Sequence, residues 1–173
     1  FGQEQAPDEI TVACWDDVIS GQGEGTGWRT GKDDPSDFLV HDAPVWGGNL
    51  AVLVSLLGTP YWPGVDNGVL FLEDVGEQPY RVERLLTTLL HSGVLAKQKV
   101  IVLGAFSGQS KTLQDRGYDM RAVVTWLRGQ TKAKVLTGLP FGHIPTKVTL
   151  PVGLRVDLAV TAREALMMWA HAH

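Results

Sequence analysis

The sequence predicts an α/β fold built on a small parallel core sheet. Two apolar runs, residues 69–72 and 100–103, are too short for helices and are typical of strands buried on both faces, and residues 135–139 predict a third short strand. Between these runs, apolar residues recur at helical spacing after Tyr80 and again after Asp119. Strands that alternate with helices in this way favour a parallel sheet, because each helix returns the chain to the edge where the next strand begins.

The segments before this core predict less regular structure. Residues 1–20 are interpreted as a short helix, and the glycine-rich, charged residues 21–35 as a loop or a pair of edge strands. Residues 38–45 predict a strand that the two glycines at 47 and 48 interrupt. The following residues 50–57 are apolar on nearly every face, which predicts a buried helix capped by Asn49. The glycines then serve either close backbone packing or a helix N-terminus that faces a ligand.

The C-terminal part of the sequence changes character. Apolar residues alternate strictly over residues 148–158, which predicts one half-buried strand. Residues 164–170 predict a final strand or helical turn.

Composition excludes several classes of function. The 173 residues suffice for one domain, or for one compact half of something larger. The net charge of −4 gives no basic footprint for nucleic acid, and no apolar run approaches the roughly 20 residues of a membrane span. Cys14 is the only cysteine, so no disulfide can form within the chain, and no Cys/His cluster has zinc spacing. We therefore expect no nucleic-acid partner, no membrane span and no bound metal.

Two residues stand where open α/β sheets place their chemistry. Glu73 follows the first buried strand, and His143 follows the third within Pro140-Phe141-Gly142-His143. A carboxylate and an imidazole together form the acid and base of a nucleophilic triad. The alternative is structural: Glu73 would be a carboxylate at a helix N-terminus and His143 a hydrogen-bonded loop residue. Spacing alone leaves both interpretations open.

A triad also needs a nucleophile, and the sequence offers no convincing one. Ser107 lies after the middle strand, but Ala105-Phe106-Ser107-Gly108-Gln109 does not match the Gly-x-Ser-x-Gly elbow that exposes a catalytic serine. Asp74 and Glu77 are expected to cap and position the helix that follows them.

Residues 46–158 contain a series of short motifs: Trp46-Gly47-Gly48-Asn49-Leu50, Leu57-Gly58-Thr59-Pro60, Leu72-Glu73-Asp74-Val75-Gly76-Glu77, Pro79-Tyr80-Arg81-Val82-Glu83-Arg84, Gly138-Leu139-Pro140-Phe141-Gly142-His143 and Thr149-Leu150-Pro151-Val152-Gly153. In this order they resemble the C-terminal half of the LD-carboxypeptidases, the muramoyl-tetrapeptide carboxypeptidases of bacterial murein recycling. Each motif is weak by itself, whereas the series is specific.

The resemblance implies a serine peptidase with a Ser-Glu-His triad in which Glu73 is the acid and His143 the base. Such an enzyme releases the terminal D-alanine of a murein tetrapeptide in the cytoplasm, and the resemblance brings no cofactor with it. The serine of the family lies in a separate N-terminal domain that this sequence does not match. We therefore expect residues 1–173 to be the C-terminal domain alone, without the nucleophile-bearing domain and inactive by itself. The absence of an initiator Met agrees with this expectation.

The resemblance also implies a compact swivelling β/β/α domain, a homodimeric enzyme, and positions for Trp46 and Asn49 near the substrate groove. Two alternatives stay open. Self-immunity peptidases that cleave peptide-nucleotide antibiotics share the same framework, and a non-catalytic domain that binds murein peptides would use the same surface.

Overall fold

A seven-stranded mixed sheet organises the molecule. The computed structural model describes residues 6–109 and 116–169, and within them the strand order is β1-β7-β6-β2-β3-β4-β5. The strands are β1 (Gly25–Arg29), β2 (Phe38–Asn49), β3 (Val69–Val75), β4 (Val100–Ser107), β5 (Lys134–Leu136), β6 (Arg155–Thr161) and β7 (Glu164–Trp169). Strands β2, β3, β4 and β5 are parallel, and β1, β7 and β6 continue the sheet in antiparallel order. The predicted α/β fold with a small parallel core is confirmed.

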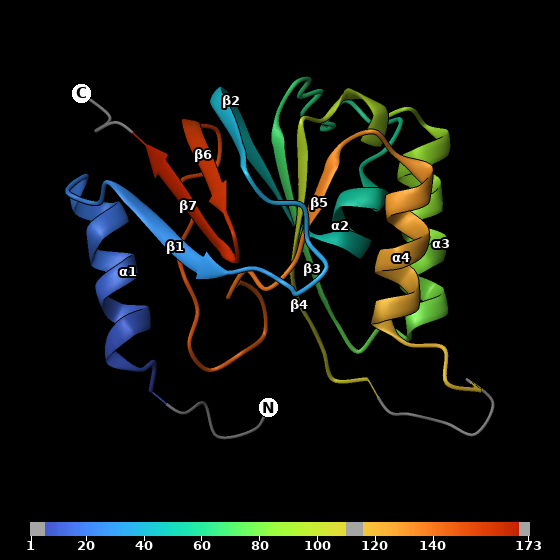
Figure 1. Ribbon diagram of the computed structural model, residues 1–173, viewed down its shortest axis with the longest axis horizontal. Helices are drawn as coiled ribbons and strands as arrows, with labels where there is room; N and C mark the ends of the chain where they lie inside the picture. Colours follow the sequence, from blue (N-terminus) through green and yellow to red (C-terminus); the bar gives the residue numbers. More distant parts are fainter. Residues whose placement is uncertain (1–5, 110–115, 170–173) are drawn as a thin grey trace.

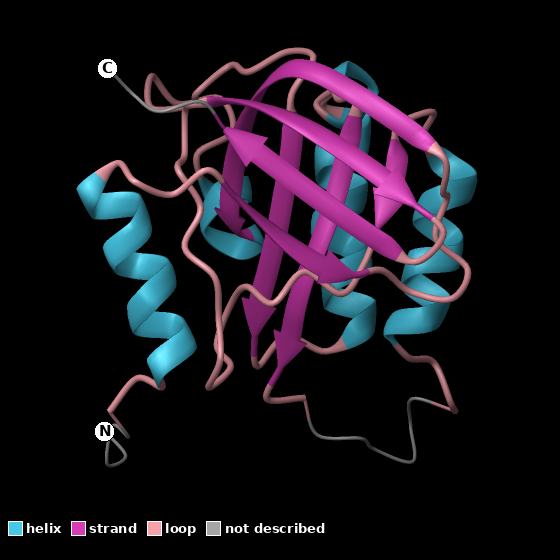
Figure 2. Cartoon of the chain, turned by 60° about the vertical axis from the view of Figure 1, so that its left-hand side comes forward, coloured by secondary structure: helices cyan, strands magenta, loops and turns pink. Residues whose placement is uncertain are grey.

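The molecule has three layers. Helices α2 (Leu50–Ser55), α3 (Pro79–His91) and α4 (Met120–Gln130) cover one face of the parallel strands (Figure 1). Strands β1, β6 and β7 cross over the other face (Figure 2). One apolar core, with Leu70, Leu72 and Leu86, lies on the helical side, and a second, with Phe71, Val102 and Met167, lies between the strand layers. The central strands β3 and β4 are therefore buried on both sides over residues 69–72 and 100–103, as their unbroken apolar sequences predict.

Strand β2 connects the two strand layers. Its first half pairs antiparallel with β6, and its second half pairs parallel with β3. The prediction that the two glycines interrupt it is wrong. Gly47 has φ +134° and lies against β3, where a Cβ atom would overlap the carbonyl oxygen of Phe71. The glycine therefore permits close packing of two strands, which is one of the two alternatives left open above.

Helix α2 is shorter and more exposed than predicted. It ends at Ser55, and only Leu50 and Leu53 are buried, whereas Val52 is 61% exposed. The predicted cap is confirmed, because Asn49 Oδ1 accepts from the Val52 N–H at 3.0 Å. The sequence is apolar on nearly every face and so predicted a fully buried helix. The strands and α3 cover only one side of this short helix, so its other side is exposed.

The C-terminal strand prediction is half correct. Strand β6 begins only at Arg155, because Pro151 and Gly153 (φ +92°) turn the chain in the residues before it. The final strand is confirmed as β7, and residue 170 lies outside the described residues. Strand β5 ends at Leu136, three residues earlier than predicted.

The N-terminal predictions are largely confirmed. Helix α1 (Glu9–Ser20) lies within the predicted helix, of which residues 1–5 lie outside the described part. The glycine-rich segment contributes a single edge strand, β1, rather than a pair. A short 3-10 turn, Leu95–Lys97, precedes β4. Among the described residues, the helices are all too short or too polar to cross a bilayer.

The contact at Gly47 predicts a large effect of one methyl group. Gly47→Ala places that group against the Phe71 carbonyl at a backbone angle that L-residues rarely adopt, so we expect it to lower the free energy of unfolding by roughly 3–5 kcal/mol. Urea denaturation measures the change. Gly129→Ala is the matched control, because Gly129 is helical and has open space around it. That variant is expected to gain up to about 1 kcal/mol. Equal stability of the two variants would contradict the close approach.

Candidate active site

The structure brings Glu73 and His143 together at the carboxyl ends of the parallel strands. Glu73 lies in β3, and its side chain is only 5% exposed. His143 lies in the loop after β5, and its imidazole is 60% exposed. The Nδ1 atom of His143 lies 3.0 Å from Oε2 of Glu73. The acid is thus buried and the base is open to an approaching group.

The hydrogen bond determines which imidazole nitrogen is available. An ionised carboxylate oxygen can only accept, so in the neutral imidazole Nδ1 carries the hydrogen and donates it. The Nε2 atom is then left with a lone pair that can accept a proton from a substrate or a nucleophile. Orientation of an imidazole by a buried acid is the requirement for a general base in acyl transfer.

Asn49 supplies the other contact of the Glu73 carboxylate. Its Nδ2 group donates to Oε1 of Glu73 and to Oδ1 of Asp74, each at 3.1 Å. Its Oδ1 atom is occupied by the cap of α2. Both carboxylates require a donor, so these contacts fix the orientation of the amide. The predicted site residue Asn49 therefore lies beside the acid, and the structure gives it a positioning contact.

The prediction that Asp74 caps the following helix, α3, is wrong. Its carboxylate is buried and accepts from the backbone N–H groups of Ala51 in α2 and of Val75, at 3.0 and 2.9 Å. The correction has a simple cause, because the side chain turns toward the helix that precedes β3. Glu77 does lie next to α3, where it forms an ion pair of 3.7 Å with Arg81.

Trp46 lies away from this pair. Its side chain is 3% exposed within the helical-side core, and its indole Nε1 donates to the Gln98 side chain at 2.9 Å. Its ring packs edge-on against Trp62 at a centroid distance of 5.6 Å. Because the indole is buried and its N–H is bonded within the chain, Trp46 packs in this core, and the structure does not place it beside Glu73 and His143.

A bulge in β4 prepares the place for the histidine loop. Opposite Glu73, β4 contains one extra residue between Leu103 and Phe106. The bulge directs the Ala105 N–H to the carbonyl oxygen of Phe141, at 2.8 Å. Gly142 follows at φ +122°, and a Cβ atom there would lie 2.9 Å from Oε2 of Glu73. A glycine before the histidine is therefore required for the loop to lie this close to the buried acid.

Ser107 is close to His143 but does not face its imidazole in the manner of a nucleophile. Its hydroxyl donates to the main-chain carbonyl oxygen of His143 at 3.2 Å. This contact fixes the loop and uses the hydroxyl hydrogen. The structure thus gives the in-chain serine candidate an anchoring contact.

Helix α1 holds the same loop from its far end. The Thr146 hydroxyl donates to Oδ2 of Asp8, the residue that caps α1. The Thr11 hydroxyl donates to the Pro145 carbonyl oxygen at 3.3 Å and accepts from the Lys147 N–H at 3.0 Å. Sequence reasoning missed this clamp, because its partners are more than a hundred residues apart and no local motif connects them.

The fold and the pair of residues define a class: an α/β domain that carries a buried acid and an exposed histidine at the ends of parallel strands. Among the described residues, no group of three or more His, Cys, Asp or Glu side chains could hold a metal ion. The chain belongs to the LD-carboxypeptidase C-terminal domain family, whose model matches residues 42–158.

Similar proteins agree with this assignment. A putative carboxypeptidase of Synechocystis is 36% identical over 111 residues, which cover 64% of this chain and 37% of the relative. The microcin C7 self-immunity protein of Escherichia coli is 30% identical over 120 residues, or 66% of this chain and 33% of that protein. The crystal structure of muramoyltetrapeptide carboxypeptidase from Oxalobacter formigenes superposes with a TM-score of 0.85 and 40% identity, over 98% of this chain and 56% of that one. The chain thus spans about a third of the curated relatives and just over half of that solved structure.

The shared amide predicts distinct effects of two substitutions. Asn49→Ala removes the donor to both carboxylates and the cap of α2, so we expect unfolding to require about 2–3 kcal/mol less. Asn49→Asp keeps the cap oxygen but turns a negative charge toward Glu73 and Asp74, and should cost more at neutral pH. Urea denaturation of both variants tests the order. Ser55→Ala, which removes one exposed hydrogen bond in the same helix, is the control. A milder effect of Asn49→Asp than of Asn49→Ala would contradict this network.

The α1 clamp predicts a pH dependence. Hydrogen bonds from the Thr146 hydroxyl and the Thr11 N–H hold the pKa of Asp8 below its ordinary value. Because this pKa is lowered, the ionised carboxylate stabilises the clamp above about pH 4. That stabilisation is lost as the pH falls through the folded-state pKa. Hydrogen exchange of the Lys147 amide, corrected for the intrinsic rate, should therefore lose protection below about pH 4. Asp8→Asn should abolish this pH step, and the exposed Asp16→Asn should leave it intact; an unchanged step in Asp8→Asn would refute the clamp.

Proposed function

We propose that this chain supplies the glutamate and histidine of a serine LD-carboxypeptidase. The observation that carries the proposal is the 3.0 Å contact between Nδ1 of His143 and Oε2 of the buried Glu73, with the imidazole left open. Membership of the carboxypeptidase family supports it.

In this proposal, His143 removes the proton of a serine hydroxyl through Nε2 and later returns it to the leaving amine. Glu73 keeps the proton of the neutral imidazole on Nδ1 and stabilises the imidazolium that forms. Asn49 holds Glu73 in place. The serine and the oxyanion donors come from a second domain of the protein, since the hydroxyl of Ser107 is bonded to the His143 carbonyl. Residues 1–173 are then the C-terminal domain, and this domain alone is inactive.

We propose the terminal D-alanine of a murein tetrapeptide as the leaving group. The similarity to muramoyltetrapeptide carboxypeptidase supports this substrate. We extend the proposal to a cytoplasmic, homodimeric enzyme of murein recycling, on the basis of the family resemblance.

A self-immunity peptidase is the second candidate. The identity of 30% with the microcin C7 self-immunity protein favours it. One assay separates the two candidates. It compares cleavage of a murein tetrapeptide with cleavage of aspartyl sulfamoyl adenosine, the compound bound in a solved structure of the microcin C7 self-immunity protein. The preferred substrate decides between them.

Substitution of the pair tests the chemistry in the complete two-domain protein. Glu73→Gln and His143→Ala are each expected to lower kcat for D-alanine release by about 10³–10⁴-fold, because the base is lost or left without its acid. Chromatography of the tripeptide product measures turnover, with circular dichroism to check the fold.

Glu83→Gln and His91→Ala are the matched controls, because both residues lie on α3 away from the pair. They should retain full activity. Turnover within threefold of the unsubstituted protein in either Glu73→Gln or His143→Ala would sink the triad assignment. D-Alanine release by residues 1–173 alone would instead make Ser107 the nucleophile.

A further inference from the structure

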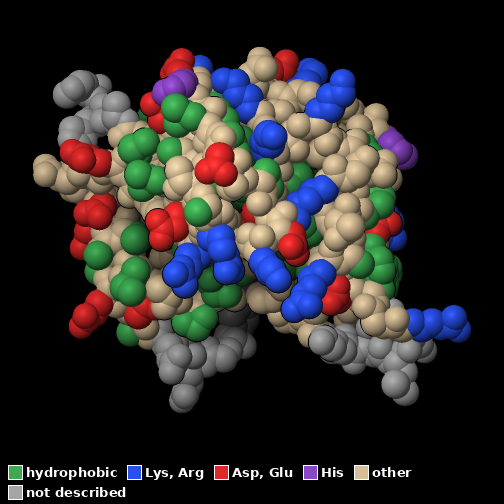
Figure 3. Space-filling model, viewed as in Figure 1, with side chains coloured by type: hydrophobic (Ala, Val, Ile, Leu, Met, Phe, Trp, Pro, Cys, Tyr) green, Lys and Arg blue, Asp and Glu red, His purple; other side chains and the backbone are tan. Residues whose placement is uncertain are grey.

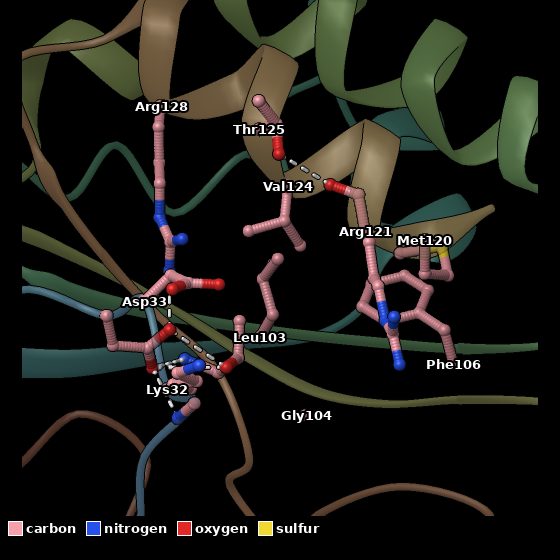
Figure 4. Close-up of a pocket in the computed structure, with 13 residues that line it drawn as sticks. Lys32, Asp33, Leu103, Gly104, Phe106, Met120, Arg121, Val124, Thr125 and Arg128 are labelled. Atoms are coloured by element: carbon pink, nitrogen blue, oxygen red, sulfur yellow. Dashed lines mark hydrogen bonds and ion pairs between the residues drawn. The ribbon is translucent and has the colours of Figure 1, made fainter. Parts of the chain in front are cut away.

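A hollow lies between α4 and residues 31–34, and the Glu73–His143 pair is not part of it. Its volume is about 680 Å³, which is ample for a small organic ligand. The end of β4 forms its floor, and the first half of α4 forms one wall (Figure 4). Neither Glu73 nor His143 lines it. Nothing assigned to the peptidase reaction uses this space.

The wall opposite α4 is rigidly held by Asp34. Its carboxylate is only 2% exposed and accepts from the Gly31 N–H at 2.9 Å, from the N–H and hydroxyl of Thr137, and from Nη2 of Arg128. These contacts tie the segment to β5 and α4 and neutralise the buried charge. The segment is therefore a fixed wall and not a loose lid.

The cations that remain around the hollow are free to meet an anion. Lys32 and Arg121 are exposed, and neither forms an ion pair within the part of the chain that the structure describes. The Nε atom of Arg128 is a buried donor without an acceptor there. Asp33 is the one carboxylate of the lining that is not already occupied. Lysine and arginine side chains gather over the middle of this face, in a protein of net charge −4 (Figure 3).

One part of the lining of the hollow is apolar. Val124 and Met120 of α4 and Phe106 of β4 are half-buried there, and Val124 points toward the buried Leu103 beneath it (Figure 4). An inorganic anion would leave the apolar part of the lining exposed to water. An uncharged apolar molecule would leave Lys32 and Arg121 without an anionic partner. A ligand with a charged head and an aliphatic body satisfies both.

We propose that this pocket binds a small organic acid, with its anionic head at the rim that carries Lys32 and Arg121 and its aliphatic body against Val124, Met120 and Phe106. The proposal does not depend on the peptidase chemistry. Two sources share this ligand chemistry: a free organic acid, and a carboxylate of a peptide that reaches past the end of β4. The second source is compatible with the structure, because the pocket adjoins the loop that carries His143. Gly104 lines the pocket and also packs against the carbonyl group of Phe141, two residues before His143.

Three probes separate the charge from the apolar body. Hexanoate, hexanol and inorganic phosphate are titrated separately into the isotopically labelled chain up to about 50 mM, well above the affinity on the order of millimolar expected for so small a ligand. Amide chemical shifts are followed by NMR. Hexanoate should shift the amides of residues 31–34, 103–106 and 120–125 with saturation, and more strongly than either other probe. No saturable shift there, or equal responses to hexanol and hexanoate, would overturn the proposal.

Charge removal provides the matched test. Lys32→Gln and Arg121→Gln should each weaken hexanoate binding about threefold, and the double variant about tenfold, as expected for exposed cations. Lys132→Gln, which removes an exposed cation outside the pocket, should leave the affinity unchanged. Unaltered affinity in the double variant would overturn the proposal.

The same variants distinguish the two sources. A murein tripeptide that shifts the pocket amides together with those of Gly142 and His143, and loses affinity in the double variant, would identify the peptide as the ligand. Hexanoate binding without tripeptide binding would identify a free acid. Failure of both to bind would reject the pocket while leaving the Glu73–His143 assignment untouched.

Discussion

Two consecutive buried carboxylates at the end of β3 impose the requirements that the rest of the site meets. Glu73 and Asp74 are each 4% exposed, and a buried charge without partners is costly. One amide, that of Asn49, serves both, and it reaches them because β2 pairs with β3 so that Asn49 lies opposite Glu73. That register depends on the close approach at Gly47. The acid of the proposed triad is thus positioned by a backbone contact in the strand next to it.

The two partners of the Glu73–His143 hydrogen bond lie in opposite environments. The acid is shielded and fully bonded, whereas the imidazole it holds is largely in solvent. An exposed histidine on a loop would ordinarily sample many orientations. Here the loop is fixed by the bulge of β4, by the hydroxyl of Ser107 and by the clamp from α1. Helix α1 lies outside the segment that the family model matches, and it nevertheless contributes to the geometry of the site.

Much of this arrangement could be predicted from the sequence, and the exceptions have physical causes. Apolar runs predicted β3, β4 and the short β5, and helical spacing predicted α3 and α4. Glu73 and His143 could be proposed as partners because both follow buried parallel strands, whose ends meet at one edge of the sheet. What failed depended on distant contacts. The passage of β2 through its glycines depends on Phe71, and the bonding of Asp74 depends on a helix that precedes it in the chain. Trp46 was expected at a groove, but an aromatic residue beside glycines in a sequence does not reveal that Gln98 and Trp62 enclose it.

The tautomer of His143 tests the central claim most directly, because every proposed step begins with a lone pair on Nε2. Long-range ¹H–¹⁵N correlation NMR on the ¹⁵N-histidine-labelled chain, at a pH where the imidazole is neutral, reports which ring nitrogen carries the hydrogen. The account predicts the Nδ1–H form, with an Nε2 resonance typical of an unprotonated nitrogen. An Nε2–H form would mean that Glu73 does not hold the imidazole as a base, and would contradict the account.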